Sequence, residues 1–423
     1  MSGPAGPTGA VAAHQRRVLA VLAGTQVLGG VGMATALAVS TLIAARLSGS
    51  EVLGGLALTC VVLGTAAAAL VLSRLTPRLG RRPVLSLGYG AGALGGVGAV
   101  VAVSAGSAVG LLVALLFVGS ATASGLAARF AATDLAEPDR RARSLALVVW
   151  ATTIGAVVGP NLAGPVQGVA GALGLVPGTG PFLLCTVAFG LAAAGVWVGL
   201  RPDPLLLARA SQQVGAVGPV RGAQIRAALL ASPAALLGVG AVVVGHLVMV
   251  GLMSMAPVHL DHGGATLAVV GLVISVHVAG MYAFSPVFGW LADRVGRVRV
   301  LTLAGVLLSA AGVACALAGP TDSVLLGVGL VLLGLGWSAA LVAGSTLLSE
   351  SVPLPVRPGA QGLADVAMNL SGAAGGVAAG LVVAGASFAV LGVGVAVLVA
   401  ACLLVGRTVL VHAEPRAGVP VPP

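Results

Sequence analysis

The stretch from Gly289 to Val300, GWLADRVGRVRV, places an acid and three arginines around a glycine. A similar stretch lies 216 residues earlier, from Ser73 to Val84, SRLTPRLGRRPV. Both stretches have Leu at the third place, Arg at the sixth, Gly at the eighth and Arg at the ninth. The offset is about half the chain, and such spacing indicates an internal duplication. The earlier copy has Pro77 where the later copy has Asp293.

The residues on either side of these two stretches are strongly apolar. Of the 423 residues, 58% are hydrophobic and only 8% are charged, with a mean hydropathy of +1.11. A soluble domain carries about 25% charged residues, so this composition excludes a water-exposed surface. Runs of about 20 apolar residues predict membrane-spanning helices. The chain contains twelve: 18–44, 52–73, 84–104, 108–129, 144–169, 181–200, 233–257, 266–290, 300–319, 323–347, 360–384 and 387–410.

The basic residues fix the expected orientation. All 21 are Arg, and with the N-terminus in the cytoplasm only Arg46 falls on the outer side. This distribution predicts a multi-pass protein of the cell membrane with both termini cytoplasmic. The first apolar run, 18–44, is too long for a signal peptide. The net charge of +10 does not predict nucleic-acid binding, because aromatic residues make up only 3% of the chain.

The loop pattern predicts two halves of matching length. We expect a cytoplasmic tail at 1–17, a six-helix half at 18–200, a cytoplasmic linker at 201–232, a second six-helix half at 233–411 and a C-terminal tail at 412–423. The linker is mixed polar and carries four arginines. The predicted fold class is an all-α membrane protein with twelve transmembrane helices in two pseudo-symmetric six-helix halves.

The repeated turn and the twelve spans together resemble the major facilitator superfamily, whose hallmark is G-x-L-A-D-R-x-G-R-[RK] between helices 2 and 3, echoed between helices 8 and 9. The second copy matches at Gly289, Asp293, Arg294, Gly296 and Arg297, and the first copy matches at Arg78, Gly80 and Arg81. The resemblance implies that the acid braces one half against the other as an inner gate. It pairs Asp293 with Arg143 at the start of helix 5. The equivalent Arg357 lacks an acid, because Pro77 replaces it.

The fifth helix contains GAVVGPNLAG, which resembles the helix-5 motif of drug/proton antiporters within the superfamily. The matching residues are Gly155, Gly159, Pro160 and Gly164. Glycine allows close packing and proline bends the helix. A generic kinked packing helix is the alternative interpretation. Such antiporters also carry an Arg within helix 4. Here Arg129 lies nearer the inner end of the predicted span and is a weak substitute.

Ionisable residues inside a membrane span are costly and mark function. The proton-coupling candidates are Asp365, His246 and His277. Gln361, Asp365 and Asn369 recur every fourth residue, so they share one helix face. The alternatives are an acid that fixes helix packing and histidines that bind neighbouring carbonyl groups.

Flexible methionines and scattered polar groups suit a cavity that accepts varied apolar shapes. Ordinary packing is the alternative. The cavity and substrate candidates are Gln26, Met33, Trp150, Met249, Met253, Met281, Gln361 and Asn369.

The sequence indicates no cofactor and no resident metal. Without Lys there is no phosphate-binding GxxxxGK[ST] loop, and no catalytic cluster predicts an enzyme. His259, Asp261 and His262 have the residue types of a metal site, but we interpret them as a solvated outer loop.

The sequence therefore predicts a secondary transporter that exports small amphipathic or apolar compounds in exchange for protons by alternating access. Its expected partners are the small-molecule substrate, protons and the lipid bilayer, and a monomer suffices. An uptake carrier or facilitator for a small metabolite is the first alternative. A non-transporting membrane scaffold or sensor is the alternative from another class.

Overall fold

The structure, a computed structural model, describes residues 9–49, 51–211, 221–265 and 267–413. Within these ranges every regular element is helical. Twelve segments are long and apolar enough to cross a membrane, which confirms the predicted fold class. Asp261 keeps its place at the end of a helix, but its side chain lies outside the described residues.

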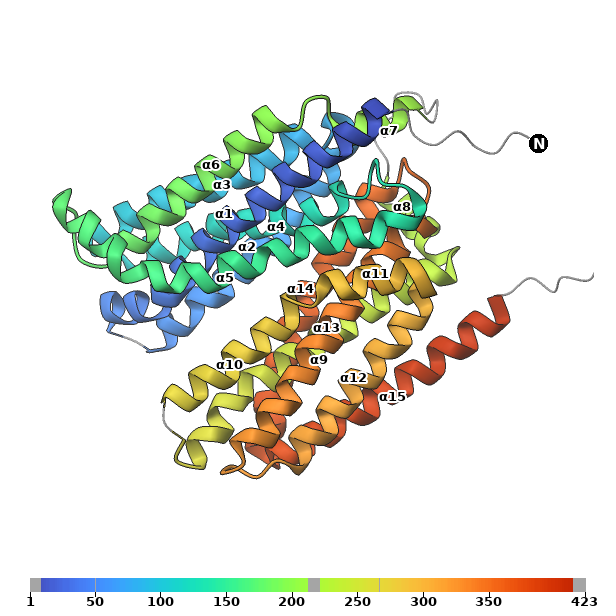
Figure 1. Ribbon diagram of the computed structural model, residues 1–423. Helices are drawn as coiled ribbons and strands as arrows, with labels where there is room; N and C mark the ends of the chain where they lie inside the picture. Colours follow the sequence, from blue (N-terminus) through green and yellow to red (C-terminus); the bar gives the residue numbers. More distant parts are fainter. Residues whose placement is uncertain (1–8, 50, 212–220, 266, 414–423) are drawn as a thin grey trace, which may run out of the picture.

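The first half contains six long helices, and short elements connect it to the second half (Figure 1). The six are α1 (Gly9–Ser48), α2 (Glu51–Leu79), α3 (Arg81–Ser104), α4 (Ala108–Ala131), α5 (Arg141–Ala172) and α6 (Gly180–Gly199). A single 3-10 turn, η1 (Pro138–Arg140), precedes α5. The linker forms two short helices, α7 (Pro204–Ser211) and α8 (Gly222–Leu230).

The second half repeats this plan with one span divided in two. Its helices are α9 (Pro233–His262), α10 (Leu267–Tyr282), α11 (Ser285–Val295), α12 (Arg297–Leu317), α13 (Ser323–Ser351), α14 (Arg357–Gly385) and α15 (Phe388–Ala413). The sequence predicts one continuous helix over 266–290, and the structure ends α10 at Tyr282 and begins α11 at Ser285. Pro286 lies in the first turn of α11, and because proline has no N–H it fits a helix start better than a helix interior.

Each half has its own apolar core, and one core crosses between the halves. Buried side chains of α1 to α6 form the core of the first half, among them Tyr89 and Phe189. The core of the second half also includes Ala142, Ala146 and Val149 of α5. The halves therefore share packing where α5 lies against α11, and they also meet where α2 lies against α14 (Figure 1).

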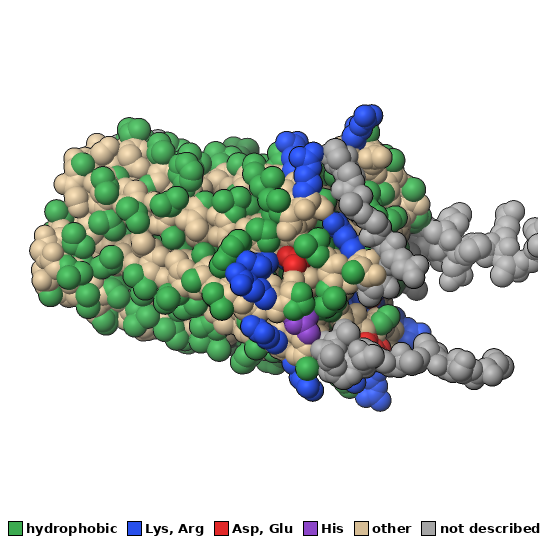
Figure 2. Space-filling view, turned by 90° about the horizontal axis from the view of Figure 1, so that it is seen from above, with side chains coloured by type: hydrophobic (Ala, Val, Ile, Leu, Met, Phe, Trp, Pro, Cys, Tyr) green, Lys and Arg blue, Asp and Glu red, His purple; other side chains and the backbone are tan. Residues whose placement is uncertain are grey.

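Arginine side chains gather toward one end of the molecule, as Figure 2 shows. We call this the arginine-rich end. It contains the α2–α3 turn, the segment before α5, the linker helices, the α11–α12 turn and the start of α14; its arginines include Arg81, Arg141, Arg209, Arg297 and Arg357.

Candidate functional site

The two copies of the repeated turn have the same backbone form. Gly80 joins α2 to α3 with a φ of 86°, and Gly296 joins α11 to α12 with a φ of 97°. These values lie in a region that side chains with a Cβ atom rarely adopt, so glycine permits the sharp turn. The structure thus supports the duplication that the sequence indicates.

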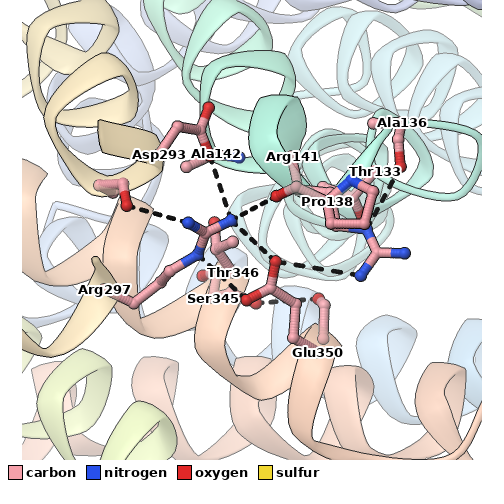
Figure 3. Close-up of polar contacts among 12 residues, drawn as sticks. Thr133, Ala136, Pro138, Arg141, Ala142, Asp293, Arg297, Ser345, Thr346 and Glu350 are labelled. Atoms are coloured by element: carbon pink, nitrogen blue, oxygen red, sulfur yellow. Dashed lines mark hydrogen bonds and ion pairs between the residues drawn. The ribbon is translucent and has the colours of Figure 1, made fainter. Parts of the chain in front are cut away.

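Asp293 of α11 reaches across to the other half (Figure 3). Its carboxylate accepts hydrogen bonds from the backbone N–H groups of Ala142, at 3.1 Å, and Arg143, at 3.0 Å, in the first turn of α5. The guanidinium of Arg143 lies 3.6 Å away, and the Asp293 side chain is fully buried. A helix N-terminus carries partial positive charge and unpaired N–H groups, so it favours an anion at this place.

Arg297 connects Asp293 to two further groups (Figure 3). Its Nη2 lies 3.2 Å from the Asp293 carboxylate. Its Nε and Nη2 donate to Glu350 of α13 at 3.0 and 2.9 Å, a bidentate pair. Nη2 also donates to the carbonyl of Pro138 in the opposite half at 2.6 Å. Arg141 completes the cluster, with Nη1 3.9 Å from Glu350.

The first half contains an equivalent acid–arginine pair 216 residues earlier. Arg81 corresponds to Arg297, and it donates to Asp134, the counterpart of Glu350, through Nε at 2.8 Å and Nη2 at 3.3 Å. Nη2 of Arg81 also donates to Gln361 of α14 at 2.8 Å, so this pair too contacts the opposite half. Arg81, Asp134 and Gln361 are all buried.

The two junctions differ at the position of the motif acid. Pro77 occupies it in α2, and its carbonyl accepts a hydrogen bond from Nη1 of Arg209, a linker residue, at 2.6 Å. Asp203, also in the linker, accepts from the backbone N–H of Arg82 at 2.7 Å. Linker side chains therefore form hydrogen bonds with backbone groups at the end of α2 and the start of α3. Nε of Arg357 is buried without a hydrogen-bond partner among the described residues.

Small residues let the halves approach closely at both junctions. A Cβ atom on Gly289 would lie 2.6 Å from the Cβ of Ala146 and 2.8 Å from the carbonyl oxygen of Ala142. A Cβ atom on Gly362 of α14 would overlap the side chain of Ser73 in α2. Each contact thus requires glycine on one side and a small residue on the other.

Deeper in the bundle, one ion pair joins the two halves. Nη2 of Arg129 in α4 lies 2.5 Å from the carboxylate of Asp365 in α14. Arg129 is 1% exposed and Asp365 is 2% exposed. Nε of Arg129 donates to Ser345 at 3.4 Å, and its Nη1 is buried without a partner in the described part of the chain. Removing one charge of such a pair would leave the other buried and uncompensated.

The other two candidates on α14, Gln361 and Asn369, lie on either side of Asp365 along the helix. Gln361 accepts from Arg81 and donates to Ser349 at 3.0 Å, so it lies in the junction. Asn369 donates to the backbone carbonyl of Asp365 at 2.8 Å. The structure therefore brings Gln361 and Asp365 into contact with the other half, whereas Asn369 bonds within its own helix.

The two histidine candidates lie apart from the junction. Nδ1 of His246 accepts from the indole N–H of Trp337 at 3.0 Å, so this nitrogen carries no proton. The ring of Tyr282 meets Trp337 edge-on. Nδ1 of His277 lies 2.6 Å from the carbonyl oxygen of Leu330 and so donates to it. This is a histidine that binds a neighbouring carbonyl group, as in the alternative interpretation of the sequence.

The cavity candidates fall into two groups. In the first half, Gln26 accepts from the hydroxyl of Tyr89 at 3.2 Å and donates to Thr152 at 3.4 Å. Trp150 is 37% exposed, and Met33 is a partly buried residue against the first core. In the second half the methionines pack into the apolar core; Met249 and Met281 are buried and Met253 is partly buried.

The helix-5 glycines contact α1. A Cβ atom on Gly155 would lie 2.7 Å from the Cα of Gly30, and one on Gly159 would lie 2.8 Å from the Cβ of Ala34. Helix α5 continues through Pro160, and Gly164 faces open space. The first two glycines of the motif therefore serve close packing within the first half.

The outer histidines do not gather into a metal site in the described residues. Nε2 of His259 contacts the carbonyl of Ala318 at 3.1 Å, and its ring stacks on Phe388 with centroids 4.3 Å apart. His262 is exposed.

Sequence reasoning missed the acids Asp134 and Glu350, and it undervalued Arg129. One signal was present. Asp134 is followed by Arg141 and Glu350 by Arg357, each after six intervening residues and at the offset of the repeated turn. Extending the comparison of the two halves beyond the turn would have found both acids.

Comparison with known proteins agrees with this architecture. The family model described as Major Facilitator Superfamily matches residues 21–268 and 239–422. YdeG of Bacillus subtilis, an uncharacterized MFS-type transporter, is 38% identical over 380 residues, covering 89% of this chain and 88% of its own. The riboflavin transporter RfnT of Brucella anthropi is 28% identical over 361 residues, covering 84% and 85%.

Solved structures show the same fold. The human organic anion transporter MFSD10 superposes with a TM-score of 0.72 at 16% identity, covering 94% of this chain and 99% of its own. A bacterial homologue of the iron transporter ferroportin, in an outward-facing state, superposes with a TM-score of 0.67 at 17% identity, covering 94% and 100%. The duplicated turns, the twelve spans and these matches lead to one conclusion: the chain belongs to the major facilitator superfamily, and it is a membrane transporter rather than an enzyme.

Proposed function

We propose that this transporter exports small amphipathic or apolar compounds from the cytoplasm in exchange for protons, by rocking residues 18–200 against 233–411. The arginine-rich end faces the cytoplasm in this proposal, as the distribution of arginines favours. The observation that carries it is the buried Arg129–Asp365 pair, which lies between the halves and contains a protonatable group.

The proposed coupling follows from the charge of that pair. Ionised Asp365 attracts Arg129 and holds α14 against α4, which keeps the arginine-rich end closed. A proton taken up from outside neutralises Asp365 and removes most of this attraction. The halves then separate at the arginine-rich end, the proton leaves to the cytoplasm and substrate binds. Return of the charge closes the end again, with substrate facing outward.

Asp293 and its contacts form the inner gate in this proposal. Two backbone N–H groups, Arg143 and Arg297 surround the acid, and they come from both halves. Opening the arginine-rich end must break the hydrogen bonds to Ala142 and Arg143. In this proposal the gate stabilises the closed state, whereas Asp365 makes the opening of the arginine-rich end depend on protons.

The test is transport in everted membrane vesicles, with ethidium and acriflavine as probes. Wild-type protein should accumulate a probe when the vesicle interior is acidified, and collapse of the pH gradient should abolish accumulation. Asp365→Asn should lose this dependence, since an amide takes up no proton. Asp139→Asn is the matched control, because Asp139 is an exposed acid with 72% of its side chain accessible. If the Asp365→Asn variant retains transport driven by the pH gradient, Asp365 is not the coupling group.

Uptake of a planar metabolite is the second candidate function, because one relative is a riboflavin transporter. The aromatic residues Tyr282 and Trp337, with His246 beside them, would offer stacking and hydrogen bonds to such a ring system. Riboflavin uptake by intact cells, independent of the pH gradient, would favour this candidate over the exporter.

A further inference from the structure

The two halves differ on the surface where their first, third and sixth spans meet. In the first half these are α1, α3 and α6, and two aromatic rings fill the space between them. Tyr89 and Phe189 are both 0% exposed, with ring centroids 6.5 Å apart. The rings lie against glycines: a Cβ atom on Gly29 would be 3.2 Å from Tyr89, and one on Gly32 would be 2.9 Å from Phe189.

In the second half the equivalent helices are α9, α12 and α15, and they leave a groove. The position that corresponds to Tyr89 at the offset of the repeated turn holds Gly305, so no ring stands between α9 and α12, and Leu403 of α15 packs against this glycine. The groove has a volume of about 430 Å³, and almost all of its lining is apolar. Its lining includes Leu237, Ala241, Gly305, Leu308, Cys402 and Val405. A volume of this size matches the cavities that bind ligands in proteins.

The length and position of the groove match one leaflet of a bilayer. Along α9 its lining runs from Pro233, the first residue of the helix, to Gly245. At 1.5 Å per residue this distance is roughly 18 Å. Half of the hydrocarbon core of a bilayer is about 15 Å thick. The groove therefore begins at the arginine-rich end and extends to about the middle of the membrane.

An arginine follows a groove residue in sequence at that end. Val298 in the first turn of α12 lines the groove, and the neighbouring Arg299 is exposed. Its Nη1 donates to the carbonyl of Val295 at 3.3 Å, which keeps the guanidinium near the helix start. A guanidinium at the depth of lipid headgroups attracts phosphate.

We propose that this groove binds one acyl chain of an anionic phospholipid from the leaflet at the arginine-rich end, with the lipid phosphate at Arg299. The apolar lining excludes a polar ligand, and α9, α12 and α15 are membrane spans, so lipid is the surrounding solvent. Between α1 and α3 of the first half, the Tyr89 ring lies against Gly29. The proposal does not depend on the substrate or on the direction of transport.

The test uses the full chain in bilayer nanodiscs that contain phosphatidylglycerol with a photoreactive diazirine in one acyl chain. After illumination, labelled peptides are quantified by mass spectrometry. The groove segments 236–245, 301–308 and 399–406 should be labelled severalfold more than segments 20–29, 85–92 and 191–198 of α1, α3 and α6. Equal labelling of the two halves would indicate ordinary surrounding lipid and overturn the proposal.

Filling the groove provides the second arm. Val405→Phe places a ring in the groove that Val405 lines, and Val405 is 61% exposed, so the change should not disturb folding. It should reduce labelling of the groove segments severalfold. Leu191→Phe on α6 is the matched control, because Leu191 is a similarly exposed apolar residue of the first half at 55%. Should the Val405 variant fail to fold, Ala241→Phe fills the same groove from α9. Unchanged labelling in a folded, groove-filled variant would overturn the proposal.

The headgroup contact is tested with phosphatidylcholine that carries the same diazirine chain. Wild-type protein should be labelled more by phosphatidylglycerol, and Arg299→Gln should remove this preference, whereas Arg46→Gln at the other end of the bundle should retain it. Equal labelling of the wild type by both lipids would refute the phosphate contact. A dimer crosslinked through Cys402, which is exposed in the groove, would show that a second copy of the chain is the occupant and would also overturn the proposal.

Discussion

At the α5–α11 junction the carboxylate of Asp293 binds the first N–H groups of the opposing helix, whereas at the α2–α14 junction Pro77 takes the equivalent place. Both junctions keep an acid–arginine pair next to the turn, Arg297 with Glu350 and Arg81 with Asp134. The two junctions therefore keep different parts of the duplicated turn. The acid–arginine pair next to the turn is present in both halves, whereas the acid of the turn itself, Asp293, is present in the second half alone.

The second junction is closed by other means. The linker supplies Arg209 to the carbonyl of Pro77 and Asp203 to the start of α3. The buried pair of Arg129 with Asp365 adds a contact that the first junction lacks, because the equivalent positions hold Ser345 and Val149. One junction thus has an acid at a helix end, and the other contains a buried arginine–aspartate pair between the halves.

The largest effect should come from breaking the buried pair. Arg129→Leu leaves the Asp365 carboxylate without its cation, which costs about 3–5 kcal/mol for a buried pair. We expect a clear fall in the thermal unfolding temperature of the detergent-solubilised protein. The double variant Arg129→Leu/Asp365→Leu should recover most of that stability but not pH-driven transport. If the single variant is as stable as the wild type, the pair does not hold this junction together.

A smaller effect is expected at the other junction. Asp293→Asn removes the charge that binds the start of α5, and hydrogen bonds to charged groups contribute about 1.5–3 kcal/mol. The equilibrium should shift by tenfold or more toward the state open at the arginine-rich end, at about 1.4 kcal/mol per factor of ten. Spin labels on α5 and α11 would report this shift as a longer distance distribution. An unchanged distribution would reduce Asp293 to a topological anchor.

The smallest effect should come from restoring the missing acid. By the symmetry of the two junctions, we expect Pro77→Asp to place a carboxylate toward the start of α14, where Nε of Arg357 is buried without a partner among the described residues. Such a charge near a helix end is worth about 0.3–1 kcal/mol. We expect a modest shift toward the closed state in the same distance measurement between α2 and α14. Arg209→Gln should lengthen the distance between α2 and α14 in the wild-type background, and it should lengthen this distance less in the Pro77→Asp background. Equal effects in both backgrounds would show that the linker does not compensate for Pro77.

Local sequence signals predicted much of the fold. Apolar run length identified the twelve spans, and the repeated turn identified the two halves, because both depend on residues close together in the chain. The structure also contains the expected contact between Asp293 and the start of α5. That contact came from resemblance to a family, since the residues themselves give no pairing between distant helices.

The sequence did not predict the contacts that depend on helix rotation and depth. Arg129 lies in the last turn of α4, and only the packing of α4 against α14 brings it to Asp365. The break before Ser285 was also missed, because the run 266–290 is continuously apolar and a single proline does not always interrupt a membrane helix. Whether the methionines line a cavity stays a prediction.

The division of the eighth span has a consequence for how this protein could be taken apart. Helix α11 belongs to the second half by sequence, yet it packs on Ala142 and Ala146 of α5, which are part of the second core. A gene cut between α8 and α9 would therefore encode two fragments that each carry an uncovered apolar surface. Co-expressed fragments should associate through that surface, and each fragment expressed alone should be degraded. The chain would then fold as one unit despite its internal duplication.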